Sequence, residues 1–180
     1  NEIRATGGFI GVAVEVTLDE GNLTTLVYHD STTVDPQPLS RNPSPPDGLY
    51  WYLWHDRMLF RDSNWNPHFP AAAAKIAEIY RLGQGVQVDG VITGTKALTL
   101  DIVDVIGDMR VPGASEVLNR ERAEAYAEGF LPYPCQPHHS SDRGKRCFDE
   151  DLFFQLNDRL TAGIPAKPRQ ELMKLFRTHL

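Results

Sequence analysis

The sequence predicts an α/β fold in which a mixed β-sheet has helices packed on its faces. Apolar residues alternate with smaller or polar ones from Ile10 to Leu18, which indicates a strand. Residues 71–82 place their apolar side chains on one helical face, and a short apolar segment follows at 88–92. At 180 residues the chain is long enough to bury a core, and we expect residues 1–180 to form a single domain.

A β-hairpin is expected near the start of the chain. Residues 19–22, Asp-Glu-Gly-Asn, have turn chemistry, and Leu23 to His29 is predicted to return as the second strand. Residues 31–47 are rich in proline, serine and asparagine, which predicts a long Pro-rich loop within the domain. The aromatic run from Leu49 to Trp54 predicts a short strand or a packed loop.

The middle of the chain is expected to form a loop–helix–strand–helix unit. The polar and aromatic segment 62–70 ends at Pro70, which suits the first turn of a helix over 71–82. Val88 to Ile92 is too short for a helix and is predicted to be a central strand buried on both faces. A second helix, from Thr95 to Ile106, is closed by Gly107.

The last third of the chain is predicted to be mainly helical. The segment 111–113 has the composition of an edge strand that runs into a turn, and 120–128 is a strongly charged helix. Phe148, Leu152, Leu156 and Leu160 recur every four residues, as in an amphipathic helix. A final helix containing Leu172 is expected to open at Pro168.

Charge and hydropathy exclude two classes of protein. The net charge is −6 and the pI is about 5.5, which argues against a general nucleic-acid binder because such a protein needs a basic face. No run of 18 or more apolar residues is present, so no part of the sequence is predicted to span a bilayer. The sequence begins at Asn1 without a methionine or a visible signal peptide, and we expect it to be a fragment of a longer protein.

Two cysteines enclose a polar segment without apolar periodicity. Cys135 and Cys147 are predicted to form a disulfide that stabilises the fold by about 3 kcal/mol. Because disulfides persist outside the cytosol, the pair favours an extracytoplasmic location. Two unpaired thiols, or a zinc site that adds His138 and His139, are the alternatives; adjacent histidines do not easily turn toward one tetrahedral ion.

Three segments taken in order resemble a known family. They are residues 2–11 (Glu-Ile-Arg-Ala-Thr-Gly-Gly-Phe-Ile-Gly), residues 62–70 (Asp-Ser-Asn-Trp-Asn-Pro-His-Phe-Pro) and residues 88–92 (Val-Asp-Gly-Val-Ile). Together they resemble the bacterial domain of unknown function family 4012, and the similarity runs over nearly the whole chain. Members of that family look like large envelope proteins with an N-terminal membrane anchor. The resemblance therefore implies a cell-envelope or cell-surface location and an anchor outside this chain.

The predicted order of elements is also similar to that of the LytR-CpsA-Psr proteins. That resemblance implies transfer of glycopolymers from polyprenyl-pyrophosphate carriers, with arginines, aspartates and Mg²⁺ neutralising the pyrophosphate. The chain departs from the pattern at two places. It has Arg4-Ala5-Thr6 where the pattern has an arginine followed by an aspartate, and Tyr28-His29-Asp30 where the pattern has proline–arginine–aspartate.

Candidate site residues lie where the expected strands end and where the 62–70 loop begins. An anionic ligand would be bound there by a tentative set of arginines, glycine amides and carboxylates: Arg4, Gly7, Gly8, Asp30, Arg57, Arg61 and Asp62. Each has a plain structural alternative, such as a strand-end charge, a bulge or a turn-initiating aspartate. No catalytic residue and no metal ligand is assigned.

Residues 55–70 offer three further kinds of candidate ligand contact. The alternation of Asp62, Asn64 and Asn66 resembles oxygen-ligand spacing for Ca²⁺, but hydrogen bonds within the loop explain it equally. Trp65 and Phe69 fit core positions or sugar platforms. His55 and His68 are isolated histidines, and neither is assigned as a ligand.

Two functions from different classes are expected. The first is a non-catalytic extracytoplasmic module of a bacterial envelope protein that binds a glycan, a lipid carrier or a protein partner. It needs no cofactor and contacts the membrane only through a segment absent from this chain. The alternative is a divergent phosphotransferase that moves polyprenyl-pyrophosphate-linked glycopolymers to an acceptor, and only this alternative calls for Mg²⁺. Nucleic acid is not an expected partner of either.

Overall fold

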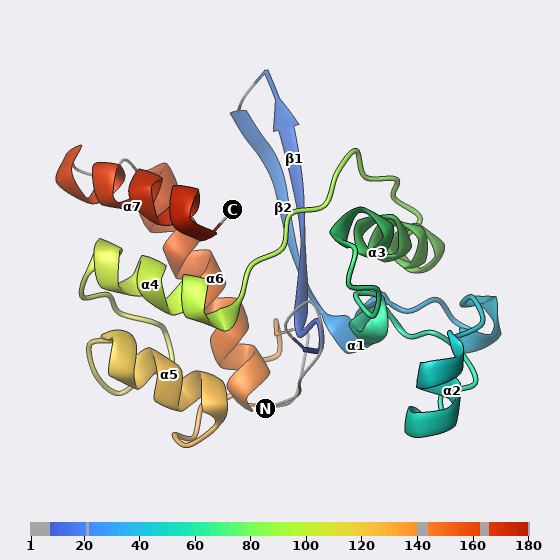
Figure 1. The fold of residues 1–180 in the computed structure, drawn as a ribbon. Coiled ribbons are helices and arrows are strands. Elements are labelled where there is room, and N and C mark those ends of the chain that lie inside the picture. Colours follow the sequence, from blue (N-terminus) through green and yellow to red (C-terminus); the bar gives the residue numbers. More distant parts are fainter. Residues whose placement is uncertain (1–7, 21, 140–143, 163–165, 180) are drawn as a thin grey trace. The chain divides into compact units, whose positions relative to one another are not determined.

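The structure is a computed structural model of the chain, and it describes residues 8–20, 22–139, 144–162 and 166–179. It combines a two-stranded antiparallel sheet with seven α-helices in these residues, so the α/β class is confirmed. The chain divides into two compact units, Asn1–Thr93 and Gly94–Leu180, which Figure 1 shows with their elements labelled. Each unit has an apolar core of its own.

Unit 1 begins with the predicted hairpin. Strand β1 (Val12–Asp19) pairs antiparallel with β2 (Asn22–Asp30), and the register shifts once, between Thr17 and Leu18. The helix-facing side of β1 is not the valine-rich one. Tyr80 of α3 (Phe69–Gln84) donates a hydrogen bond to Glu15 at 2.7 Å, whereas Val16 and Leu18 on the other face are 51% and 64% exposed.

Helix α3 is the main helix of unit 1 and matches the sequence prediction. Pro70 stands in its first turn, and Gly85 ends it with a left-handed φ of 76°. Its apolar face packs on α1 (Ser31–Val34) and on the 3₁₀ turn η2 (Phe60–Asp62). Residues from these elements and from the connecting segments form the core of the unit: Val34, Leu49, Met58, Phe60, Ile76, Ile79 and Tyr80.

Three predictions about unit 1 were wrong. Val88–Ile92 pairs with no strand in the described chain, so the described sheet is antiparallel rather than mixed. Its valines at 88 and 91 rest against the unit 1 core, but Ile92 is 88% exposed. An extended connector can place apolar side chains on a core without sheet pairing, and a short segment of this kind resembles a strand in the sequence.

The other two errors concern the segment between the hairpin and η2. The predicted Pro-rich loop contains α1 and a 3₁₀ turn, η1 (Leu39–Arg41), because the Asp30 side chain caps α1 by accepting a hydrogen bond from the Thr32 amide. The aromatic run forms a helix, α2 (Asp47–Leu53), instead of a strand or loop. Figure 1 shows α2 at the margin of unit 1, on the side of α1 away from the hairpin.

Unit 2 is helical, as the sequence predicts. Helix α4 (Lys96–Ile106) is capped by Thr95 and ends at Gly107, and α5 (Arg120–Glu128) is capped by Asn119. Helix α6 is described from Gly144 to Thr161, and α7 spans Ala166–His179. Contacts join α4 with α5 and α7, and α5 with α6. The predicted edge strand is wrong, because residues 111–113 turn and only Met109 and Leu118 form a β-bridge.

The predicted disulfide is present in unit 2. Cys135 and Cys147 are bonded, with their Cα atoms 5.4 Å apart. Cys147 is completely buried in the core of the unit, beside Phe148 and near Leu152 and Leu156. Phe148 stacks on Tyr126, with ring centroids 4.9 Å apart. In the described parts of both units, no helix is long and apolar enough to cross a membrane.

Candidate functional site

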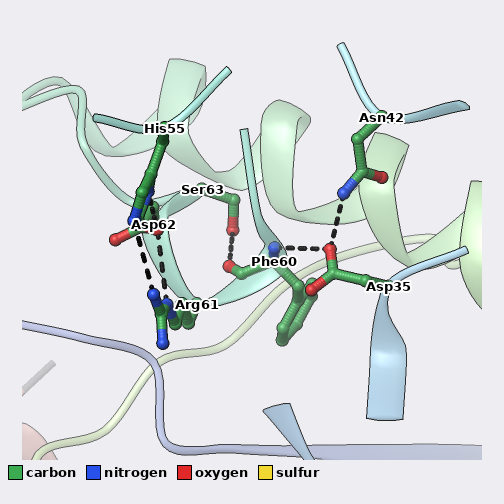
Figure 2. Close-up of polar contacts among 7 residues, drawn as sticks. All are labelled: Asp35, Asn42, His55, Phe60, Arg61, Asp62 and Ser63. Carbon is green, nitrogen blue, oxygen red and sulfur yellow. Dashed lines mark hydrogen bonds and ion pairs between the residues drawn. The ribbon is translucent and has the colours of Figure 1, made fainter. Parts of the chain in front are cut away.

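Buried polar side chains gather in unit 1 where α1, η1 and η2 meet. The Asp35 carboxylate at the end of α1 organises one half of this cluster (Figure 2). Its Oδ1 atom accepts hydrogen bonds from the Phe60 amide at 2.8 Å and from the Asn42 side chain at 2.7 Å. Burial raises the pKa of Asp35, while these two hydrogen bonds and the charge of Arg61 oppose that rise.

The other half of the cluster consists of His55, Arg61 and Asp62. The Asp62 side chain is completely buried, and its Oδ2 atom lies 3.2 Å from Nδ1 of His55 and 3.6 Å from Nε of Arg61. The second ring nitrogen of His55, Nε2, lies 3.4 Å from Nη2 of Arg61. Figure 2 shows the three side chains turned toward one another, beside the turn that Ser63 closes by donating to the Phe60 carbonyl at 2.6 Å.

The partners define which ring nitrogen of His55 carries the proton. A carboxylate only accepts and a guanidinium only donates. The neutral tautomer that suits both neighbours therefore has its proton on Nδ1, toward Asp62, and its lone pair on Nε2, toward Arg61. A buried carboxylate that orients an imidazole in this way leaves Nε2 as the basic atom of the pair.

Arg61 connects this cluster to the solvent. Its side chain is 39% exposed, and its guanidinium lies over the Phe9 ring, 5.3 Å from the centroid. Its backbone carbonyl accepts a hydrogen bond from Ile10 at 3.0 Å, which holds the start of the hairpin against η2. The arrangement presents a fixed, half-exposed cation with a histidine beside it, and such a pair suits an anionic group.

The structure brings some of the predicted site residues together and separates others. Arg61 and Asp62 are in contact. Arg57 donates to the Asn42 carbonyl at 3.4 Å, on the Asp35 side of the cluster. Asp30 is buried and caps α1, rather than initiating the turn that the sequence offered as its plain alternative. Arg4 and Gly7 lie outside the described residues.

Gly8 contributes its carbonyl rather than its amide. The Gly8 backbone has a φ of 99°, and its oxygen accepts a hydrogen bond from the Asn64 side chain at 2.8 Å. Asn66 accepts from the His68 amide at 2.8 Å. The side chains of Asp62, Asn64 and Asn66 therefore serve separate contacts of the loop, and these contacts explain their alternation without a bound cation.

The two aromatic residues of the 62–70 loop have different surroundings. Trp65 packs against the core of unit 1, whereas Phe69 is 41% exposed. The Trp65 ring also lies where a side chain at Gly48 would begin, 2.7 Å from the ideal Cβ position, so the start of α2 approaches it closely. The core interpretation of Trp65 is confirmed.

Sequence reasoning missed His55, Asp35 and Asn42 as members of the cluster. His55 follows an aromatic run, and no helical or strand periodicity relates it to Asp62. Asp35 and Asn42 fall in the Pro-rich segment that was expected to be irregular. The one local sequence signal is at Asp35, which directly precedes Pro36. In the structure Asp35 follows the four-residue helix α1.

Comparison with known proteins places the chain in a family. A family model described as "Protein of unknown function (DUF4012)" matches residues 1–129, which end at the glycine that caps α5. The chain belongs to this family. No curated protein and no solved structure matches it.

A second polar cluster of this DUF4012 chain lies in unit 2, within the segment that the disulfide encloses and on α6. His138, His139 and Asp151 bring their ligand atoms within 4.8 Å of one another, as a metal site would. The His139 side chain is completely buried, with Nε2 3.0 Å from Oδ2 of Asp151. The same carboxylate oxygen accepts a hydrogen bond from Tyr133 at 2.6 Å.

The hydrogen bond at the other ring nitrogen of His139 decides whether this cluster fits a metal ion. Nδ1 accepts a hydrogen bond from the Gln136 amide at 2.6 Å, so the ring proton is on Nε2 and points at Asp151. A metal ion beside Asp151 would need a lone pair at that atom. The geometry fits a neutral histidine that ties the disulfide-closed segment to α6. The cysteines are bonded to each other, so the zinc site that would use them is wrong.

Proposed function

We propose that this DUF4012 chain is an extracytoplasmic module of a bacterial envelope protein that binds an anionic group without catalysing a reaction. The anionic group belongs to an envelope glycan, a lipid carrier or a protein partner. The binding residues are Arg61 and His55, with Arg57 at the edge of the same cluster. The observation that carries the proposal is the half-exposed Arg61 side chain, whose guanidinium lies beside Asp62, His55 and Phe9.

The distances and the burial within the cluster limit where an anionic group could bind. Charge-assisted hydrogen bonds are usually about 2.7–2.9 Å long. The contacts of Asp62 with His55 and Arg61 are longer, at 3.2 and 3.6 Å, and neither His55 Nδ1 nor Arg61 Nε meets the geometry of a hydrogen bond in the described chain. Both nitrogens are buried, so an anionic group would approach the exposed part of the Arg61 side chain and leave the contacts with Asp62 in place.

The interior of unit 1 also supports binding over catalysis on a lipid-linked substrate. A polyprenyl chain needs a long apolar groove, and the space between α1, η2 and α3 is occupied by side chains such as Phe60, Ile79 and Tyr80. The extracytoplasmic location rests on the disulfide, which is compatible with an oxidising compartment.

One observation favours the phosphotransferase alternative. The Asp62–His55 pair leaves the lone pair of His55 Nε2 directed at the Arg61 guanidinium, and if Arg61 turned to hold a phosphoryl group, Nε2 could take a proton from an acceptor hydroxyl. Asp30 and Asp62 would then be the carboxylates near which Mg²⁺ is sought. The departures at residues 4–6 and 28–30 from the LytR-CpsA-Psr pattern count against this function.

Binding of polyprenyl phosphate in detergent micelles tests the proposal, with inorganic pyrophosphate as the soluble probe. Arg61→Gln should weaken binding of both by about tenfold or more, because it removes a charge-assisted contact of about 1.5–3 kcal/mol. Arg81→Gln is the control, since Arg81 is an exposed arginine of α3 in the same unit. Equal binding by native chain and Arg61→Gln would reject the site.

A turnover assay separates the two functions. The chain is given a polyprenyl-pyrophosphate-linked glycan, an acceptor and Mg²⁺. Transfer by the native chain that falls in His55→Asn by much more than binding does would establish the phosphotransferase. Binding without transfer by the native chain supports the non-catalytic module.

A further inference from the structure

Five consecutive apolar or aromatic side chains of unit 1 are open to solvent on α2 and at its end. They form what we call the aromatic patch, and their exposed fractions are Tyr50 49%, Trp51 67%, Tyr52 81%, Leu53 38% and Trp54 88%. Only Leu49 of this helix is buried and anchors it to the core. Solvent-exposed apolar groups in one continuous segment usually mark an interaction surface.

The fold itself does not require a tryptophan at position 54. Trp54 ends α2 in the left-handed conformation, with φ 55° and ψ 32°. At this position a helix favours glycine, and a bulky residue costs about 1–2 kcal/mol in that conformation. Because the side chain is almost fully exposed, its packing does not offset this cost. Packing within unit 1 therefore does not explain a tryptophan at this position.

We propose that the aromatic patch docks this protein onto the interface of a lipid bilayer. Tryptophan and tyrosine have apolar rings with one polar group, and this chemistry is favourable at the level of lipid headgroups. Successive residues on a helix point about 100° apart, so these five side chains surround the end of α2 rather than forming one stripe. A fluid interface can contact them all, whereas a flat, rigid partner cannot.

The ring geometry of Tyr50 and Trp51 suits a bilayer better than a glycan. A sugar platform needs an open, flat aromatic face, but Tyr50 and Trp51 pack edge to face, 5.1 Å apart and at 85°. That arrangement covers one face of a ring with the edge of the other. Leu53 adds an aliphatic side chain that offers nothing to a sugar and is favourable in the apolar part of an interface.

The charges around the patch indicate which bilayer it suits. Residues 48–54 carry no charge, and the flanking residues from 41 to 57 supply two arginines and two aspartates, Arg41, Asp47, Asp56 and Arg57, which cancel. A zwitterionic headgroup layer is complementary to such a neutral, mixed set. Binding should therefore depend little on salt or on anionic lipid. It is independent of the proposed anion site and gives this chain a membrane contact besides any anchor.

Co-sedimentation of the 180-residue chain with phosphatidylcholine vesicles tests the proposal, together with quenching of tryptophan fluorescence by brominated lipid. We expect binding and quenching, both largely unchanged in high salt. Trp54→Gly should weaken binding by about tenfold or more. The same substitution should keep or raise the free energy of unfolding, because glycine suits the left-handed position. Trp51→Ser with Tyr52→Ser is the second variant.

Phe130→Ser and Arg81→Gln are the matched controls. Phe130 is an 80% exposed aromatic residue of unit 2, and Arg81 is an exposed arginine of α3; replacement of either should leave vesicle binding unchanged. Three results would each overturn the proposal. They are no binding to phosphatidylcholine vesicles, equal binding by all patch variants, and binding only to anionic vesicles that high salt abolishes. If a soluble glycan shields the fluorescence of Trp51 and Trp54 from a quencher and the chain does not bind vesicles, the patch binds sugars instead.

Discussion

The carbonyl oxygen of Val34 occupies the place where a side chain at Gly83 would begin. An ideal Cβ atom at position 83 would lie 1.7 Å from that oxygen, and the next nearest atoms are also backbone. The close approach fixes α1 against the last turn of α3. It also holds Asp35, the residue after Val34, in reach of η2. The contact therefore connects the packing of unit 1 to its polar cluster.

Gly83→Ala should destabilise unit 1 even though alanine is the better helix former. The gain in helix propensity is about 1 kcal/mol. The shift of α1 that the new methyl group forces should cost more, and we expect a net loss of about 1–3 kcal/mol in urea unfolding. Gly90→Ala is the control, because nothing lies within 4 Å of an added Cβ there. A Gly83→Ala protein as stable as the control would show that α1 and α3 are not in contact.

Asp62→Asn should lower the free energy of unfolding by about 1–3 kcal/mol, because a charge that faces His55 and Arg61 inside the protein is removed. Denaturant unfolding measures the loss. Asp56→Asn changes an exposed aspartate of the same loop and should stay within about 0.5 kcal/mol of the native chain. If the two substitutions cost the same, the buried position of Asp62 is not as described.

Ile79→Ala and Ile92→Ala should differ strongly, although the sequence makes both look buried. Ile79 is completely buried on α3, and its truncation should cost about 2–5 kcal/mol. Ile92 is 88% exposed, and its truncation should change stability by no more than about 0.5 kcal/mol. A large loss of unfolding free energy in the Ile92 variant, measured by the same urea titration, would support the buried strand that the sequence predicted.

The isoleucine pair shows why part of the fold was predictable. Ile76, Ile79 and Tyr80 repeat with the period of a helix over a long segment, and both ends carry helix signals at Pro70 and Gly85. Ile92 lies in a five-residue segment with three apolar side chains, at 88, 91 and 92, and such a short segment fits a strand, a buried turn of helix or an extended connector equally well. Only tertiary contacts decide among these, and they place Val88 and Val91 on the core without a pairing strand.

The candidate site was less predictable than the helices for a similar reason. Arg61 and Asp62 are neighbours in a polar loop, so a site there could be expected. His55 joins them because α2 ends in a left-handed residue, Trp54, and this turn directs the chain back toward η2. An aromatic run does not predict such a turn, since left-handed residues are usually glycine or asparagine.

Removal of the disulfide should destabilise the chain by about 2–4 kcal/mol. The suitable variant is Cys135→Ser with Cys147→Ala, because Cys147 is buried among apolar side chains and a serine there would bury a hydroxyl. Unfolding is followed in parallel on the native chain with and without reductant. A reduced native chain that is as unstable as the variant confirms that the disulfide is the origin of the loss. If the variant and the reduced native chain both unfold at the same denaturant midpoint as the oxidised native chain, the prediction is contradicted.

His29 should make stability depend on pH just below 6.5. Its Nε2 atom lies 3.1 Å from the hydroxyl of Tyr80, which donates to Glu15, and burial lowers the pKa of His29 below 6.5 while Glu15 partly opposes this. The unfolded chain then binds a proton at a higher pH than the folded chain does. Stability is full above about pH 6.5 and falls as the pH drops toward the folded pKa.

His29→Gln should remove that part of the pH dependence, because glutamine keeps a donor for Tyr80 but does not titrate. Urea unfolding of both chains across this pH range measures it, and the difference between the two curves is the quantity of interest. Contributions of other groups, such as Asp35 with its raised pKa, cancel in that difference. The native chain should lose stability relative to the variant as the pH falls below 6.5. Parallel curves would mean that His29 titrates alike in the folded and unfolded chains, and the network of Glu15, Tyr80 and His29 would then not desolvate the imidazole.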